Sequence, residues 1–182
     1  MRTRNWMAAL LACGIAVAPV AAQAPATPPE PAPQAVEQLR HVIGLWDVET
    51  DFIGADGAVT QSFVGQYRFG WVVNDRVVSG MSTIPSLNQA SGILFFARPA
   101  QNEIEMSSVG PDGHLWRMIG PDTSETRTTP NTPMADGTTI MLRFTRYAVE
   151  QNRFQSRMEV STDGGETWRV GNEQRFVRAA QN

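Results

Sequence analysis

The chain has 182 residues and a formal net charge of −3, and every one of its 15 basic residues is arginine. The absence of lysine excludes Schiff-base chemistry and a P-loop lysine. Positive charge is neither in excess nor clustered, so the composition gives no footprint for nucleic-acid binding.

The N-terminal residues have the organisation of a secretory signal peptide. Two arginines precede an apolar run at residues 7–17 that is too short to span a bilayer, and residues 22–24 offer a small-x-small cleavage pattern. We expect cleavage after Ala24 and a periplasmic or secreted mature chain without a membrane span. Cys13, the only cysteine, comes too early in the apolar run for a lipobox, which argues against a lipoprotein. The mature chain then contains no thiol.

A linker and one domain follow. Residues 25–33 are rich in proline and alanine, which predicts an extended, partly polyproline II spacer. Residues 34–182 have the length of a single domain. Within it, residues 34–42 carry apolar side chains at helical spacing, and Gly44 ends this predicted helix.

Beyond the helix, apolar residues alternate as they do in β-strands, and Asp-Gly pairs suited to tight hairpins separate the runs. The pattern predicts an all-β, antiparallel up-and-down barrel of about 8–10 strands. One longer connection, residues 121–136, interrupts the series of hairpins. We expect a functional or mobile loop there.

Three segments resemble known barrel families. Gly44-Leu-Trp46, placed after a helix, resembles the G-x-W opening of lipocalins and calycins. Residues 67–78 and the tail at 161–169 resemble the DUF1579-like family of secreted bacterial barrel proteins, although Asp75 stands where that family often has glycine. The resemblance covers roughly residues 36–178. It implies a calycin-like barrel that binds a small, mostly apolar molecule.

In calycins, an arginine near the last strand packs over the tryptophan of the G-x-W motif. The resemblance implies this structural role for Arg175 or Arg178, beside Gly44 and Trp46.

Residues 161–168 read Ser-Thr-Asp-Gly-Gly-Glu-Thr-Trp and match the sialidase Asp-box at each fixed position. A propeller needs several four-stranded blades, and the chain is too short to supply them. The motif therefore predicts a structural turn, in which Asp163 accepts backbone hydrogen bonds, Gly165 adopts positive φ and Trp168 packs against the barrel wall.

Asp47, Glu49 and Asp51 share one face of the first predicted strand. They form either a cation or acid–base site or, as we favour, a solvated face paired with arginines of a neighbouring strand. The two histidines are too few for a typical zinc site, and neither lies on the last strands, where a haem ligand would be sought. We expect no metal and no cofactor.

The leading hypothesis is a barrel that binds a small hydrophobic or amphipathic ligand and performs no catalysis. Aromatic, methionine and arginine side chains beside turns or on predicted walls are its candidate contacts: Trp71, Arg76, Met81, Met106, Trp116 and Met118.

Two alternatives stay open. One is a cavity enzyme, a cyclase, isomerase or hydratase, in which His114, Asp75, Arg76 and Tyr67 are the acid–base candidates. Nucleophile motifs such as G-x-S-x-G and H-E-x-x-H are absent from the sequence. The other is an envelope structural or interaction module, with the proline-rich linker as its spacer.

Overall fold

The computed structural model describes residues 27–180, and the expected signal peptide with Cys13 lies outside them. The described chain forms one α-helix, two 3-10 helices and eleven strands. In chain order they are α1 (Pro33–Val42), β1 (Gly44–Ile53), β2 (Val59–Val73), β3 (Val77–Ile84), η1 (Pro85–Leu87), β4 (Gln89–Arg98), η2 (Pro99–Gln101), β5 (Glu103–Val109), β6 (Leu115–Pro121), β7 (Thr126–Thr128), β8 (Thr132–Pro133), β9 (Thr139–Glu150), β10 (Arg153–Ser161) and β11 (Arg169–Arg178).

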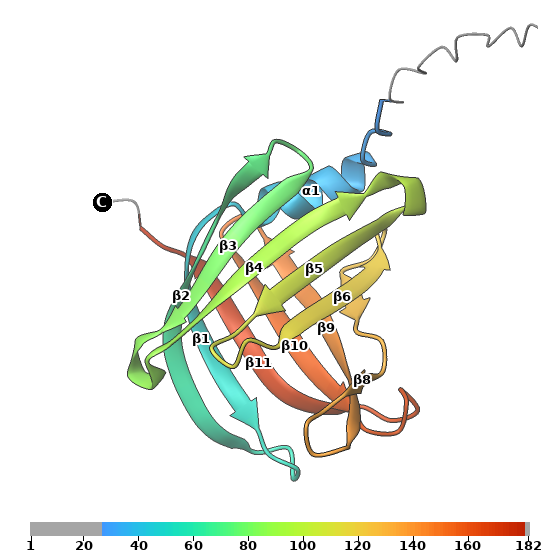
Figure 1. Cartoon of the computed structure of the whole chain (residues 1–182). Coiled ribbons are helices and arrows are strands. Elements are labelled where there is room, and N and C mark those ends of the chain that lie inside the picture. Colours follow the sequence, from blue (N-terminus) through green and yellow to red (C-terminus); the bar gives the residue numbers. More distant parts are fainter. Residues whose placement is uncertain (1–26, 181–182) are drawn as a thin grey trace, which may run out of the picture.

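Ten of these strands close into an antiparallel barrel (Figure 1). Strands β1 to β7 pair in sequence, β7 pairs with β9, and β9, β10 and β11 lead back to β1. β8 pairs with β9 and extends one end of it as a hairpin. The predicted all-β up-and-down barrel with a short N-terminal helix is confirmed. Closure gives each barrel strand two partners, which removes the exposed edge of an open sheet.

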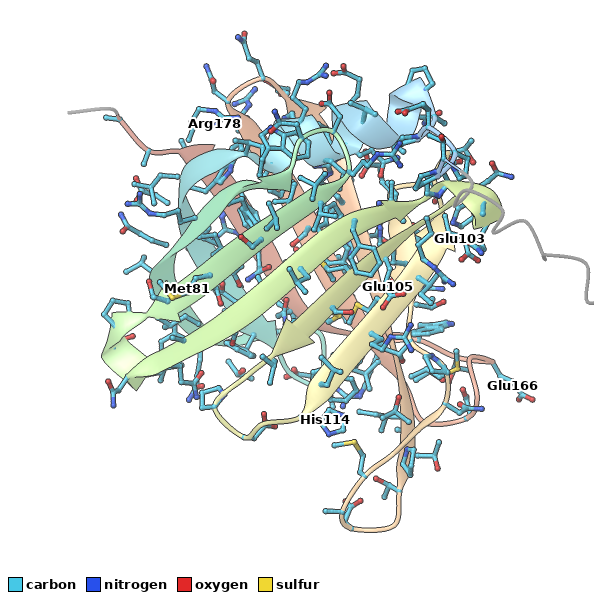
Figure 2. All side chains as sticks on the ribbon, turned by 45° about the horizontal axis from the view of Figure 1, so that its top comes forward. Met81, Glu103, Glu105, His114, Glu166 and Arg178 are labelled. Carbon is cyan, nitrogen blue, oxygen red and sulfur yellow. The ribbon has the colours of Figure 1, made fainter. Side chains whose placement is uncertain are left out.

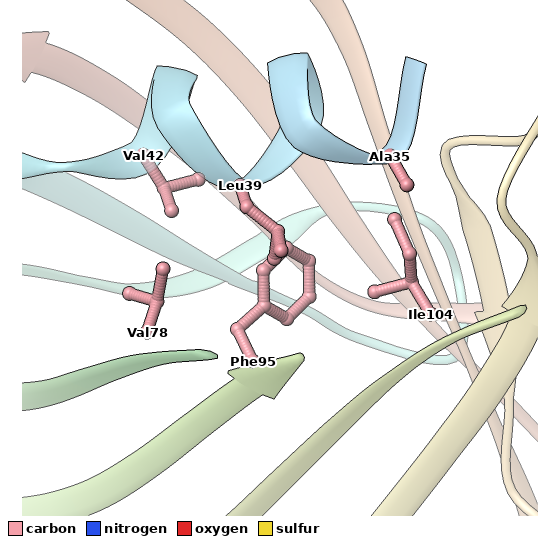
Figure 3. Packing of buried hydrophobic residues seen from close by; sticks show 6 residues of the cluster. All are labelled: Ala35, Leu39, Val42, Val78, Phe95 and Ile104. Atoms are coloured by element: carbon pink, nitrogen blue, oxygen red, sulfur yellow. The ribbon is translucent and has the colours of Figure 1, made fainter. Parts of the chain in front are cut away.

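Helix α1 lies across one end of the barrel (Figure 1), which we call the closed end. Its apolar face packs against side chains from the ends of β3, β4 and β5 (Figure 3), and the cluster consists of Ala35, Leu39, Val42, Val78, Phe95 and Ile104. The opposite, open end carries the turns after β1, β3, β5 and β10. None of the helices within residues 27–180 has the length and apolar character needed to cross a membrane.

The segment 121–136 is not the long loop expected from the sequence. It contains β7, which joins β6 to β9 and so completes the barrel, and β8. Three-residue and two-residue strands are too short to display an alternating pattern, and their sequences are rich in threonine and proline. This explains why alternation did not reveal them.

Arginines pair with carboxylates on neighbouring strands along the outer wall. Arg175 of β11 pairs with Glu49 at 3.0 Å and with Asp51 at 2.9 Å on β1. Asp47 accepts a hydrogen bond from Gln66. The pairing with an arginine of a neighbouring strand therefore holds for Glu49 and Asp51 but not for Asp47, and Asp51 is buried rather than solvated. Across the described residues, no group of three or more histidine, cysteine or acidic side chains could hold a metal ion.

Candidate ligand-binding cavity

The barrel contains a cavity of about 190 Å³ that extends from helix α1 toward the open end. Its lining comes from α1 and from strands β2 to β5 and β9 to β11. Pockets for drug-sized ligands measure about 300–1,000 Å³. This cavity therefore suits a smaller molecule.

Six of the fifteen lining residues are aromatic. The rings are Tyr67, Phe69, Phe95, Phe144, Phe154 and Phe176. Phe154 and Phe176 stack with ring centroids 4.1 Å apart, and the buried Trp46 meets Phe154 edge-on at 4.9 Å. These pairs fix the ring orientations at the closed end, so the apolar wall is shaped before a ligand arrives.

A belt of uncharged polar groups crosses the wall at mid-height. Gln174 donates to Thr50 at 3.1 Å and to the Tyr67 hydroxyl at 3.0 Å, and it accepts from Ser156 at 3.1 Å. The register explains the belt, because Ser156, Gln174 and Thr50 lie opposite one another on β10, β11 and β1. Tyr67 also bonds with Ser82, its cross-strand partner. Burial raises the pKa of Tyr67, which keeps the phenol neutral.

Charged groups meet beneath α1 at the closed end. Arg146 of β9, which lines the cavity and is only 4% exposed, donates two hydrogen bonds of 2.8 Å to the Glu125 carboxylate. Its third nitrogen, Nη1, lies 3.4 Å from the Gln38 carbonyl and 3.4 Å from Nδ1 of His41. Burial, opposed by the hydrogen bond with the Glu150 carbonyl, is the main reason why the pKa of His41 is lowered.

Arg127 of β7 is also buried there, at 1% exposure. Its Nη2 donates to the Gln38 side chain, its guanidinium lies 4.7 Å from the ring centroid of Phe95, and its Nε has no hydrogen-bond partner among the described residues. Desolvation lowers the pKa of Arg127 to about 10. Sequence reasoning missed both buried arginines. The sequence indicated burial only for Arg146, because on β9 it falls in the same alternating row as the apolar residues.

The six predicted ligand contacts do not form one site. Met106 lines the cavity, whereas Trp71 packs against the cluster beneath α1. Met118 is buried but is not part of the lining, and Trp116 lies near the open end against His114.

Arg76 and Met81 also lie outside the cavity lining. Arg76 bonds to Glu30 and to the Pro29 carbonyl at the closed end. Met81 is 53% exposed on the outer face (Figure 2). Because β3 begins with two consecutive valines, its sequence does not show which alternate residues face inward. In the structure, the inward residues include Val78 and Ser82.

The four acid–base candidates are also separated. Tyr67 faces the cavity. Asp75, paired with Arg40, and the neighbouring Arg76 lie at the turn after β2, at the closed end. Figure 2 places His114 at the other end of the barrel from Arg178. No acid–base pair is formed by these four residues.

Of the two arginines expected to pack over Trp46, Arg178 does so. Its guanidinium lies 4.1 Å from the centroid of Trp46 and donates to the carbonyls of Ile43 and His41, at 2.7 and 3.2 Å. Gly44 has a φ of 123°, and a Cβ there would come within 2.5 Å of Arg178 Nη1. Arg175, the other candidate, serves the outer ion pairs instead.

The Asp-box segment forms the turn between β10 and β11. The Asp163 carboxylate accepts from the hydroxyls of Ser161 and Thr167 and from the Thr167 backbone N–H at 3.0 Å. Gly165 has a φ of 95°, and its carbonyl accepts from the Trp168 indole. Trp168 packs beneath Arg143 with 4.2 Å between guanidinium and ring, one residue before β11 begins.

Comparison with known proteins supports the fold alone. No family model and no curated protein matches the chain. The crystal structure of Rv2717c from M. tuberculosis is similar, with a TM-score of 0.55 and 11% identity over 83% of this chain and all of that one. A structure of EF1p2_mFAP2b bound to DFHBI is more distant, with a TM-score of 0.41 and 13% identity over 81% of this chain and all of that one.

Proposed function

We propose that this protein binds a small, mostly apolar molecule inside the barrel. The observation that carries the proposal is the cavity itself, which combines aromatic walls with a few converging polar groups. Binding sites for small molecules have this composition. Removal of apolar ligand surface from water would supply most of the affinity, at about 25 cal/mol per Å².

The cavity favours this function over the other two hypotheses. A purely structural module would gain stability by filling the barrel interior with side chains. The enzyme hypothesis rested on four acid–base candidates that would have to act together, and these are separated: Tyr67 faces the cavity, whereas Asp75 and His114 lie at opposite ends of the barrel. We further propose that the chain belongs to the DUF1579-like barrels and acts after export through its signal peptide.

The test is a calorimetric titration that measures the affinity of the chain for a small aromatic probe, 2-naphthamide. Ser91 of β4 lines the cavity, and its neighbour Ala90 is exposed on the outer wall. Ser91→Phe should fill the cavity and weaken binding at least about tenfold, whereas Ala90→Phe, the matched control, should leave it unchanged. Failure of the wild-type chain to bind the probe, or equal effects of the two variants, would overturn the proposal.

A further inference from the structure

Beneath helix α1, two buried arginines exceed the single carboxylate of the described chain that pairs with either of them. Arg127 and Arg146 are both almost fully buried. Among the described residues, Arg146 pairs with the Glu125 carboxylate, whereas Arg127 donates only to the Glu125 backbone carbonyl, at 3.4 Å. Asp122 is buried nearby, but no ion pair joins it to these arginines within residues 27–180, and its backbone carbonyl accepts from Gln38. Buried charges are normally paired, so this excess requires an explanation.

The neighbouring groups do not balance the excess. His41 is held neutral by burial between aromatic rings and by the adjacent Arg146 and Arg178. Gln38 supplies its side-chain oxygen to Arg127 and its backbone oxygen to Arg146, which satisfies donors without adding negative charge. The aromatic lining adds only ring faces, over which Arg127 and Arg146 lie at 4.7 and 5.6 Å.

Arg146 lines the cavity, and its hydrogen bonds leave part of its donor capacity unused. The Glu125 carboxylate takes the Nε–H and one of the two N–H groups of Nη2, whereas both contacts of Nη1 are 3.4 Å long. N–H···O hydrogen bonds in proteins normally measure about 2.7–3.2 Å. Nη1 therefore retains donor capacity that a ligand acceptor could use.

We propose that the ligand is a small apolar carboxylic acid, bound as its anion with the carboxylate at Arg146 and its apolar body among the aromatic rings. This inference rests on the proposed function and names its ligand class. Arg127 adds positive potential behind the ring of Phe95. The carboxylate supplies the negative charge that the two buried arginines lack, and bonds between charged groups are stronger than neutral ones.

The experiment compares 2-naphthoate with 2-naphthamide, which has the same shape and no charge, on the 182-residue chain. We expect naphthoate to bind at least about tenfold more tightly, the range of one hydrogen bond to a charged group. Equal affinities would overturn the inference and leave the proposed function standing. Binding of neither probe would overturn both.

Three variants locate the charge. Arg146→Gln should abolish the preference for naphthoate while 2-naphthamide still binds. Glu125→Gln frees Arg146 and should tighten naphthoate, which keeps the inference testable if Arg146→Gln does not fold. Arg143→Gln is the matched control, because Arg143 is on the same strand but pairs with Glu159 on the outer wall. An unchanged naphthoate preference in Arg146→Gln, or a lost one in Arg143→Gln, would contradict the assignment.

Discussion

At the scale of single residues, Asp163 joins both sides of the last hairpin through one carboxylate. It accepts from Ser161 before the turn and from Thr167 after it. We expect Asp163→Ala to lower the melting temperature by a few degrees in thermal circular dichroism, because three donors lose their acceptor. Probe binding by the folded protein should be unchanged, since the turn contributes nothing to the cavity lining.

Asp56→Ala is the control for this prediction, because Asp56 also sits in a hairpin turn but accepts a single bond, from the Ala58 N–H. The melting temperature of Asp56→Ala should fall less than that of Asp163→Ala.

Hydrogen bonds from Ser161 and Thr167 lower the pKa of Asp163 below its usual value. Its contribution to stability is thus complete above about pH 3.9 and is lost as the pH falls further. The difference between wild type and Asp163→Ala should narrow on acidification; a difference that widens, or lost binding at unchanged stability, would show a different role for the motif.

The arginines show how far single residues could be assigned from the sequence. The family resemblance predicted that either Arg175 or Arg178 packs over Trp46. Only the strand register shows that Arg178 does so, whereas Arg175 points outward. Arg146 could have been placed inside, because it lies two residues after Phe144 on an alternating strand. Arg127 had no such signal, since its burial depends on Gln38 and Phe95, which are distant in the sequence.

At the scale of elements, helix α1 acts as the cover of the closed end. Leu39 is completely buried against the cluster from β3, β4 and β5. Leu39→Ala should lower the free energy of unfolding by about 3 kcal/mol, the usual cost of a leucine-sized cavity, as measured by urea denaturation. Glu37→Ala is the control on the same helix, where an exposed pair with Arg40 is worth about 0.5 kcal/mol or less. Similar losses in both variants would mean that α1 contributes through its surface and not through its buried face.

The elements that the sequence predicted best are the long ones. β1 and β2 alternate over many residues, so the inward row from Trp46 to Thr50 was evident. β3 was assigned the wrong face for Met81, because its valine pair and Gly80 leave the parity undetermined. β7 was missed because pairing with β6 and β9, and not its own three residues, makes it a strand.

At the scale of the whole molecule, carboxylates held ionised by arginines surround the barrel. Hydrogen bonds from Arg117 lower the pKa of Glu105, and those from Arg143 lower the pKa of Glu159. A hydrogen bond from Ser62, followed by one from Arg175, lowers the pKa of Asp51. Each of these groups stabilises the fold above its unfolded-state pKa and loses that contribution as the pH falls. Together they predict acid destabilisation below about pH 4.5.

His41 adds an earlier step to the acid profile. Because its folded-state pKa lies below 6.5, the unfolded chain takes up the proton first, and stability falls as the pH drops below about 6.5. In urea denaturation at a series of pH values, wild type should lose stability in two stages, the first beginning at about pH 6.5 and the second below about pH 4.5. His41→Gln cannot be protonated and should lack the first stage while keeping the second. An unchanged first stage in this variant would assign it to a group other than the neutral histidine between Arg146 and the Glu150 carbonyl.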